Sequence, residues 1–234
     1  MRVTELEKRI YLGYSATKED ALSLLLEPLD ELCKAADRIR MHFCGNRFDI
    51  CTIVNAKSGR CSEDCKYCAQ SVHYRTEIEE YPLLDADTLV SHAIRYASRG
   101  VLRYSIVTSG RALNKDEIAS LCQSIRKIKE SCPILVCVSA GLLQKEQYQM
   151  LLDAGAVRVH NNLETSERFF PHICTTHTVA DKIAAIRAAK AAGMQICSGG
   201  IIGLSETMED RIDLALTLRE LSVSSVPVNV LNPI

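Results

Sequence analysis

From about residue 47 onward, the chain alternates between short apolar runs and longer amphipathic segments. The runs have the length and the bounding turn residues of buried strands, whereas the segments repeat apolar residues at helical spacing. We therefore predict strands at six positions: Ile50–Val54, Arg103–Val107, Ile134–Val138, Val157–Asn161, Gln195–Cys197 and Val226–Leu231.

Start and stop signals flank the helices predicted between these strands. Three pairs have the spacing of capping boxes: Asn114 with Glu117, Thr178 with Asp181, and Thr207 with Asp210. Gly100, Gly155 and Gly193 are suited to end helices. Because parallel neighbours need a crossover connection, about six strand–helix units indicate a parallel sheet covered by helices.

Residues 1–46 have a different pattern, which predicts helices without strands. Thr17 can cap a helix over residues 18–26, and Pro28 can open a second one. Cys33 falls on the apolar stripe of that second helix, as Cys122 does in a later one, so we expect both to be core residues. We divide the chain into an N-terminal helical segment, 1–46, that packs on a barrel domain, 47–234.

The expected fold is α/β, a (β/α)-barrel that is incomplete. A closed barrel of eight units typically needs about 250 residues, and this chain of 234 residues spends its first part on helices. It therefore stops about two units short. We interpret its last residues as a strand and the start of a loop, and expect a C-terminally truncated chain.

The composition argues against nucleic acid and membrane as partners and bears on the cellular compartment. A net charge of −1 gives no basic field for nucleic acid, and no apolar run approaches the roughly 18 residues of a membrane span. With no secretory signal at its start, the chain is expected to be cytoplasmic. Eleven cysteines, an odd number, fit metal ligands and small core residues better than disulfides in that compartment.

Three cysteines stand close together just after the first predicted strand. Cys61, Cys65 and Cys68 have Cys-x3-Cys-x2-Cys spacing, so all three thiols can turn inward on one loop. A structural zinc site uses four ligands, whereas a cubane iron–sulfur cluster held by three cysteines leaves one iron open for a small molecule. The loop therefore predicts a metal centre that binds a small molecule, in contrast to a purely structural metal site.

Further polar groups follow the other predicted strands. Ligands bind at the carboxyl ends of parallel strands, so these groups are expected to face one cavity. Cys137 and Cys197 could hold a second metal centre there, although each could equally be a small buried residue. The glycines of Gly199–Gly203 would let the backbone approach a ligand closely.

The three-cysteine loop, with Tyr67 before its last cysteine, resembles the signature of radical S-adenosylmethionine (SAM) enzymes. Four further stretches resemble the biotin synthase family in particular, and the similarity extends from about Arg47 to the last residue. These stretches are Asn55–Arg60, Asn162–Ser166, Cys197–Glu206 and Val226–Leu231.

The resemblance implies a function and a set of cofactors. Cys61, Cys65 and Cys68 would hold a 4Fe-4S cluster whose open iron binds SAM. A 5′-deoxyadenosyl radical would then take hydrogen from dethiobiotin, and sulfur from an auxiliary iron–sulfur cluster would close the thiophane ring. No protein side chain is assigned as the catalytic group, because the cofactors supply the radical.

The resemblance also implies residues that bind SAM and substrate. Tyr67 and Ile201 would line the adenine site, and Asn162 and Glu164 would reach the ribose. Lys182 replaces an arginine near the SAM carboxylate, which keeps the charge and loses the bidentate geometry. On the last strand, the side chain expected to meet the ureido ring of dethiobiotin is Asn229.

One departure from the family pattern concerns the auxiliary cluster, usually a 2Fe-2S centre. Cys137 and Cys197 match its ligands, but Ser105 stands where a third cysteine is expected. A serine hydroxyl is a poorer iron ligand than a thiolate. We therefore expect a cluster of another nuclearity, or a cysteine recruited from beyond Ile234.

Two alternatives remain at this point. A related radical SAM enzyme that rearranges or cleaves amino acids would share the first cluster and the barrel, and a zinc-binding structural domain would share only the cysteine loop. For partners we expect dethiobiotin, an electron donor such as flavodoxin or ferredoxin, and a homodimer, without nucleic acid or membrane.

Overall fold

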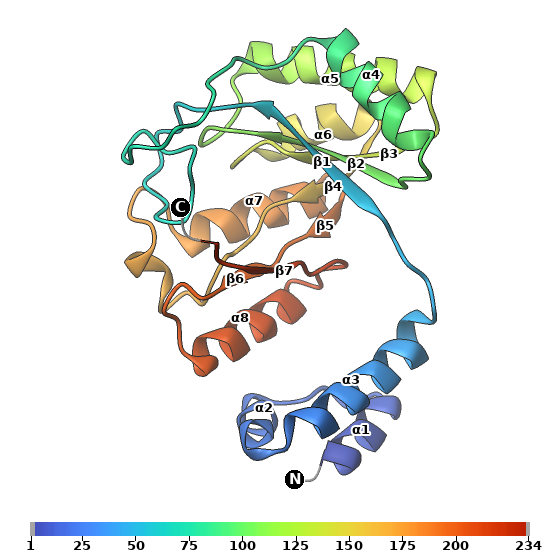
Figure 1. Ribbon diagram of the computed structural model, residues 1–234, viewed down its shortest axis with the longest axis vertical. Helices are drawn as coiled ribbons and strands as arrows, with labels where there is room; N and C mark the ends of the chain where they lie inside the picture. Colours follow the sequence, from blue (N-terminus) through green and yellow to red (C-terminus); the bar gives the residue numbers. More distant parts are fainter. Residues whose placement is uncertain (1–2, 233–234) are drawn as a thin grey trace.

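The computed structural model describes residues 3–232, and its centre is a parallel sheet with helices on its outer face (Figure 1). Five parallel strands pair in the order β1-β2-β3-β4-β5. Their bounds are Cys51–Lys57 for β1, Arg103–Thr108 for β2, Leu135–Ser139 for β3, Ala156–His160 for β4 and Gln195–Cys197 for β5. The predicted α/β fold with a parallel sheet is confirmed.

Helices follow the strands in alternation and cover one side of the sheet (Figure 1). The helices of this part are α4 at Ala86–Ala97, α5 at Lys115–Ser131, α6 at Lys145–Asp153, α7 at Val179–Ala191 and α8 at Met208–Glu220, with a short 3-10 helix at Phe170–His172. The three predicted capping boxes, which begin at Asn114, Thr178 and Thr207, each form both of their hydrogen bonds. All three predicted stop glycines have positive φ angles.

A second parallel pair continues the curve of the sheet. It consists of β6, Gly200–Ile202, and β7, Val228–Val230. Single bridges, Glu164 to Gly200 and Cys197 to Ser225, link this pair to the ends of β4 and β5. Within residues 3–232, β7 does not pair with β1, so the described strands do not close into a barrel.

Strand β6 was not among the predicted strands, because Gly199 and Gly200 indicated a loop whose backbone could approach a ligand. A Cβ at Gly199 would lie 1.8 Å from the carbonyl oxygen of Pro227, and one at Gly200 would lie 2.5 Å from that of Glu164. These glycines therefore allow close packing of three backbone segments, and because Gly200 begins β6, the expectation of a loop at this residue is wrong.

The N-terminal part forms helices α1, Val3–Tyr11, α2, Lys18–Ser23, and α3, Leu29–Cys44, with a 3-10 turn at Leu24–Leu26. Figure 1 shows these helices beneath α8, joined to β1 by an extended segment. Lys18 in α2 pairs with Glu209 at 2.9 Å and with Asp213 at 2.6 Å. The helical segment thus contacts the barrel through α8.

The apolar stripe predicted for α3 is wrong in phase. Cys33, expected in the core, is exposed, and Ala35 is the buried residue of this helix. Cys122 in α5 is 2% exposed and lies in the core as predicted. The difference arises because α3 packs mainly against α1, whereas α5 packs against neighbours of the barrel.

Asp210 connects α8 to the loop that follows β4. Its carboxylate, almost fully buried, accepts hydrogen bonds from Ser166 Oγ at 2.6 Å and from Arg168 Nη2 at 2.7 Å, and it also caps α8 through Thr207. Burial alone would raise the pKa of Asp210, but the hydrogen bonds from Ser166 and Thr207 outweigh burial and lower this pKa to about 2.

We predict that Asp210→Asn lowers the free energy of unfolding at pH 7 by about 2 kcal/mol, because the charged acceptor is lost. The folded-state pKa lies below the ordinary value of 3.8, so the contribution is complete above about pH 4 and disappears as the pH falls toward 2. Urea unfolding of the cluster-free protein at a series of pH values measures this difference.

The matched control is Asp116→Asn, which removes an exposed carboxylate from the first turn of α5 and should change stability by less than about 0.5 kcal/mol. If the loss of unfolding free energy in Asp210→Asn stays constant from pH 7 to pH 3, the stabilising role given to the charged Asp210 carboxylate is wrong.

Candidate active site

The three predicted cluster cysteines lie on an irregular loop that follows β1. Backbone hydrogen bonds between Ser58 and Tyr81 close the base of the loop, and Cys61 N–H donates to the Gln70 carbonyl at 3.0 Å. Cys61 and Cys65 are buried and Cys68 is half-buried. All three line one cavity of about 780 Å³ on the inner side of the strands.

The environment of these thiols suits a metal centre. Burial raises the pKa of Cys65 and of Cys68, so without a cation both remain protonated near neutral pH. A metal ligand must be a thiolate, and a bound cation provides the charge that compensates for burial. Three thiols that face one cavity therefore fit the predicted three-cysteine cluster.

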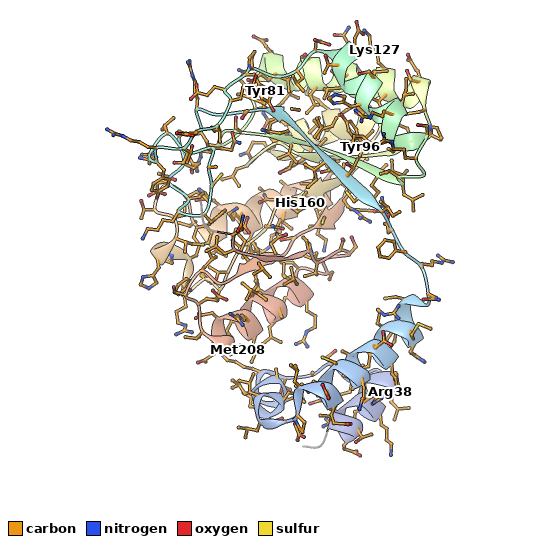
Figure 2. The ribbon with its side chains drawn as sticks, in the orientation of Figure 1. Arg38, Tyr81, Tyr96, Lys127, His160 and Met208 are labelled. Atoms are coloured by element: carbon orange, nitrogen blue, oxygen red, sulfur yellow. The ribbon has the colours of Figure 1, made fainter. Side chains whose placement is uncertain are left out.

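A second group of sulfur atoms lies deeper in the same cavity. Cys137 on β3 and Cys197 on β5 both line the cavity, as predicted. Ser105 pairs with Cys137 in the β2–β3 register and also lines the cavity. His160, which Figure 2 labels near the middle of the molecule, has Nδ1 3.3 Å from Cys197 Sγ.

Cys51 is a third thiol in this second group, and sequence reasoning missed it. It begins β1, opposite Arg103 of β2, and lines the cavity. The pKa of Cys137 is raised to about 11, first by burial and then by the nearby Cys51. The available signal was alternation, because Cys51, Ile53 and Asn55 share the inward face of β1.

Four residues expected to bind SAM line the same cavity as the three-cysteine loop: Tyr67, which lies on that loop, and Asn162, Glu164 and Lys182. Asn162 Oδ1 accepts a hydrogen bond from Gly199 N–H at 2.9 Å, and Lys182 Nζ donates to the Asn162 carbonyl at 3.0 Å. The Lys182 side chain is therefore held at the end of β4 and directed into the cavity.

Glu164 combines burial with an unusual backbone conformation. Its φ is 73°, in the left-handed region that non-glycine residues rarely adopt. Burial raises the pKa of its carboxyl, and the ammonium group of Lys182 partly offsets this effect. Its Oε2 has no hydrogen-bond partner among the described residues. An unpaired buried carboxylate oxygen that faces a cavity is suited to a hydroxyl-bearing ligand.

Two other predicted binding residues lie outside this cavity. Ile201 lines a neighbouring cavity of about 230 Å³ between β6 and α8, which Glu164 also borders. Asn229 stands opposite Ile201 on β7, is exposed, and lines neither of these two cavities. The structure thus brings Ile201 to Glu164 and leaves Asn229 outside the linings of both cavities.

The structure also shows a group that no sequence pattern indicated. Cys174 Sγ lies 3.7 Å from Cys65 Sγ and 3.3 Å from His177 Nδ1, and the His177 ring is 2.6 Å from Glu63 Oε2. Neither Cys174 nor His177 belongs to a motif identified in the sequence. The two cysteines are 109 positions apart in sequence, so spacing gives no signal for their contact.

Comparisons with known proteins agree with this geometry. The radical SAM superfamily model matches residues 56–218. A biotin synthase of Clostridium botulinum is 56% identical over 232 residues, which cover 99% of this chain and 73% of the relative. The biotin synthase 2 of Corynebacterium diphtheriae is 56% identical over 98% of this chain and 70% of its own length.

The chain belongs to the biotin synthase family of radical SAM enzymes. Its fold is also found in more distant proteins: methylornithine synthase superposes with a TM-score of 0.84 at 20% identity, over 97% of this chain and 68% of that one. That likeness concerns the fold alone. Membership of an enzyme family leaves the zinc-binding structural domain without support. Within the described residues, no helix is long and apolar enough to cross a membrane.

We predict that Asn162→Ala destabilises the protein by about 1–3 kcal/mol, because the buried Gly199 N–H loses its acceptor. Urea unfolding of the cluster-free protein measures the change. Asn55→Ala, at an exposed position of β1, is the matched control and should cost less than about 0.5 kcal/mol. Equal effects of the two substitutions would contradict the structural role given to the Asn162 side chain.

Proposed function

We propose that this protein inserts sulfur into dethiobiotin to form biotin. The observation that carries the proposal is the presence of two separate thiol groups in one cavity. Cys61, Cys65 and Cys68 lie at the loop end, and Cys137 and Cys197 lie deeper along the strands. A reaction that needs both a radical source and a sulfur source requires two such centres on either side of its substrate.

The residues present fit a cluster at each place, because both groups offer thiols, the ligands that iron–sulfur clusters require. When bound, the first cluster supplies the electron that splits the sulfonium of SAM, and the auxiliary cluster supplies the sulfur. The chain itself positions the dethiobiotin carbon and excludes water. The enclosing strands and the loop over residues 58–81 provide that shielding.

We assign the SAM-binding roles as follows. The Lys182 ammonium pairs with the SAM carboxylate, because it is a buried cation directed into the cavity beside the three-cysteine loop. Asn162 and Glu164 bind the ribose, and the unpaired Glu164 oxygen accepts from a ribose hydroxyl. The adenine lies between Tyr67 and Ile201. Asn229 is retained as the residue for the ureido ring.

For the auxiliary centre we propose Cys51 as a ligand with Cys137 and Cys197. The three lie on β1, β3 and β5, and each lines the cavity. Cys51 offers the thiolate that Ser105 lacks, so a cysteine from beyond Ile234 is not needed for a third sulfur ligand. Ser105, buried and paired with Cys137 in the strand register, then has a packing role and is a poorer iron ligand than Cys51.

The family resemblance supports the remaining assignments: a flavodoxin or ferredoxin as electron donor, a homodimer, a cytoplasmic location, and a boundary at residue 46 between the helical segment and the barrel domain. Related radical SAM enzymes that rearrange or cleave amino acids remain the second candidate. The deep group around Cys137 and Cys197 favours sulfur insertion over these.

Anaerobic turnover with dethiobiotin, SAM and a reductant tests the proposed function. We expect biotin together with about two equivalents of 5′-deoxyadenosine, because two C–H bonds must be broken, one radical for each. Both products should fall to background in Cys68→Ser. Deoxyadenosine that forms without biotin in the active enzyme would instead support the second candidate.

The auxiliary ligand set is tested in a protein that lacks the first cluster. After anaerobic reconstitution, the triple variant Cys61→Ser, Cys65→Ser, Cys68→Ser should keep iron, sulfide and visible absorption that belong to the deep group. Adding Cys51→Ser should remove most of that iron, because one thiolate ligand is lost.

Adding Cys33→Ser, at an exposed position in α3, is the control and should leave the iron content unchanged. If Ser105→Ala abolishes the residual cluster while Cys51→Ser does not, the assignment of Cys51 is wrong. If the triple variant binds no iron, the auxiliary centre itself is wrong.

A further inference from the structure

A compact group of metal-ligating side chains lies next to the three-cysteine loop. It consists of Cys65 on that loop, and of Cys174 and His177 in the segment between β4 and α7. One ligand atom from each lies within 4.8 Å of the other two. Cys174 is 3% exposed and His177 is 7% exposed. Among the described residues, neither Cys61 nor Cys68 belongs to this tight group.

The separation of the two sulfurs in the group matches that of two ligands on one tetrahedral metal ion. With zinc–sulfur bonds of about 2.3 Å and zinc–nitrogen bonds of about 2.0 Å, tetrahedral angles place two sulfurs about 3.8 Å apart, and a sulfur and a nitrogen about 3.5 Å apart. The Cys65 and Cys174 sulfurs are 3.7 Å apart. Cys174 Sγ lies 3.3 Å from His177 Nδ1 and 3.9 Å from His177 Nε2. A cubane cluster held by Cys61, Cys65 and Cys68 does not need Cys174 and His177 close to Cys65, because both residues lie outside the three-cysteine loop.

The surroundings of His177 also resemble those of a metal ligand. Its Nδ1 lies 2.6 Å from Glu63 Oε2, and in the tautomer that donates from Nδ1 to this carboxylate, Nε2 keeps its lone pair. A carboxylate on the second ring nitrogen is the usual partner of a zinc-bound histidine. Arg111 and Thr176 in turn hold the Glu63 carboxylate, at 3.2 and 2.9 Å.

We infer that, in the cluster-free protein, Cys65, Cys174 and His177 bind one zinc-class divalent ion, with Glu63 orienting the histidine. Cys65 and His177 both face the main cavity, so a water molecule or a small ligand can take the fourth position. Because Cys65 is also a ligand proposed for the 4Fe-4S cluster, the single ion and the cluster exclude each other. Binding of the ion itself does not depend on the proposed function.

The obvious competitor is the three-cysteine loop, which could itself hold a divalent ion through Cys61, Cys65 and Cys68. The double variant Cys61→Ser, Cys68→Ser separates the two sites, since it removes two of the three loop thiols and leaves the proposed group intact. Cobalt(II) is a suitable probe, because the intensity of its thiolate charge-transfer band reports how many sulfurs bind it.

We expect the anaerobically chelated double variant to bind one equivalent of cobalt with the intensity of two thiolates, and zinc to displace it. Adding Cys174→Ser should halve that intensity and weaken binding by more than about 100-fold, because a direct ligand is lost. Adding Glu63→Gln should weaken binding by about 10- to 100-fold without a change in thiolate number, as expected for an orienting group.

Adding Cys122→Ser is the matched control, since Cys122 is a buried cysteine in α5, outside this group, and cobalt binding should not change. Urea midpoints of all variants show whether each is folded. If the folded double variant binds no cobalt while Cys174→Ser alone binds one equivalent with three thiolates, the ion belongs to the three-cysteine loop and the inference is overturned.

Discussion

Parallel pairing of β1 through β5 is the constraint on which the rest of this structure depends. In a strand, alternate residues point to the same face, and the register of the pairs places those faces side by side. Cys51, Cys137 and Cys197 therefore reach one cavity although they are far apart in sequence. A one-residue slip in any pair would turn a thiol toward the covering helices.

Burial of several cavity thiols links the fold to its cofactors. Inside the cavity the pKa values of Cys65, Cys68 and Cys137 are raised, so the cluster-free protein holds neutral thiols and avoids uncompensated charge. A bound metal reverses that balance, because it stabilises the thiolate form. The fold can thus form before its clusters, and metal binding then adds to its stability.

Cys65 is where the proposed function and the further inference meet. On one side it shares the loop with Cys61 and Cys68, and on the other it contacts Cys174. Cys174 and His177 are fixed by the turn before α7, and Glu63 ties that turn back to the loop. A loop held in this way presents Cys65 to either kind of metal centre, so the two proposed centres compete for this thiol.

The sequence by itself determined the strand–helix alternation, the capped helix starts and the three-cysteine loop, because each depends on residues close together in the chain. It also placed Cys137 and Cys197 on strands. It did not predict which face of α3 is buried, since Cys33 is exposed. Nor did it predict β6 as a strand, because its glycines allow contact with backbone segments far away in the sequence. Only the tertiary structure decided that Cys51 joins the deep thiols and that Cys174 meets Cys65, since strand register and loop docking bring together residues that no local pattern connects.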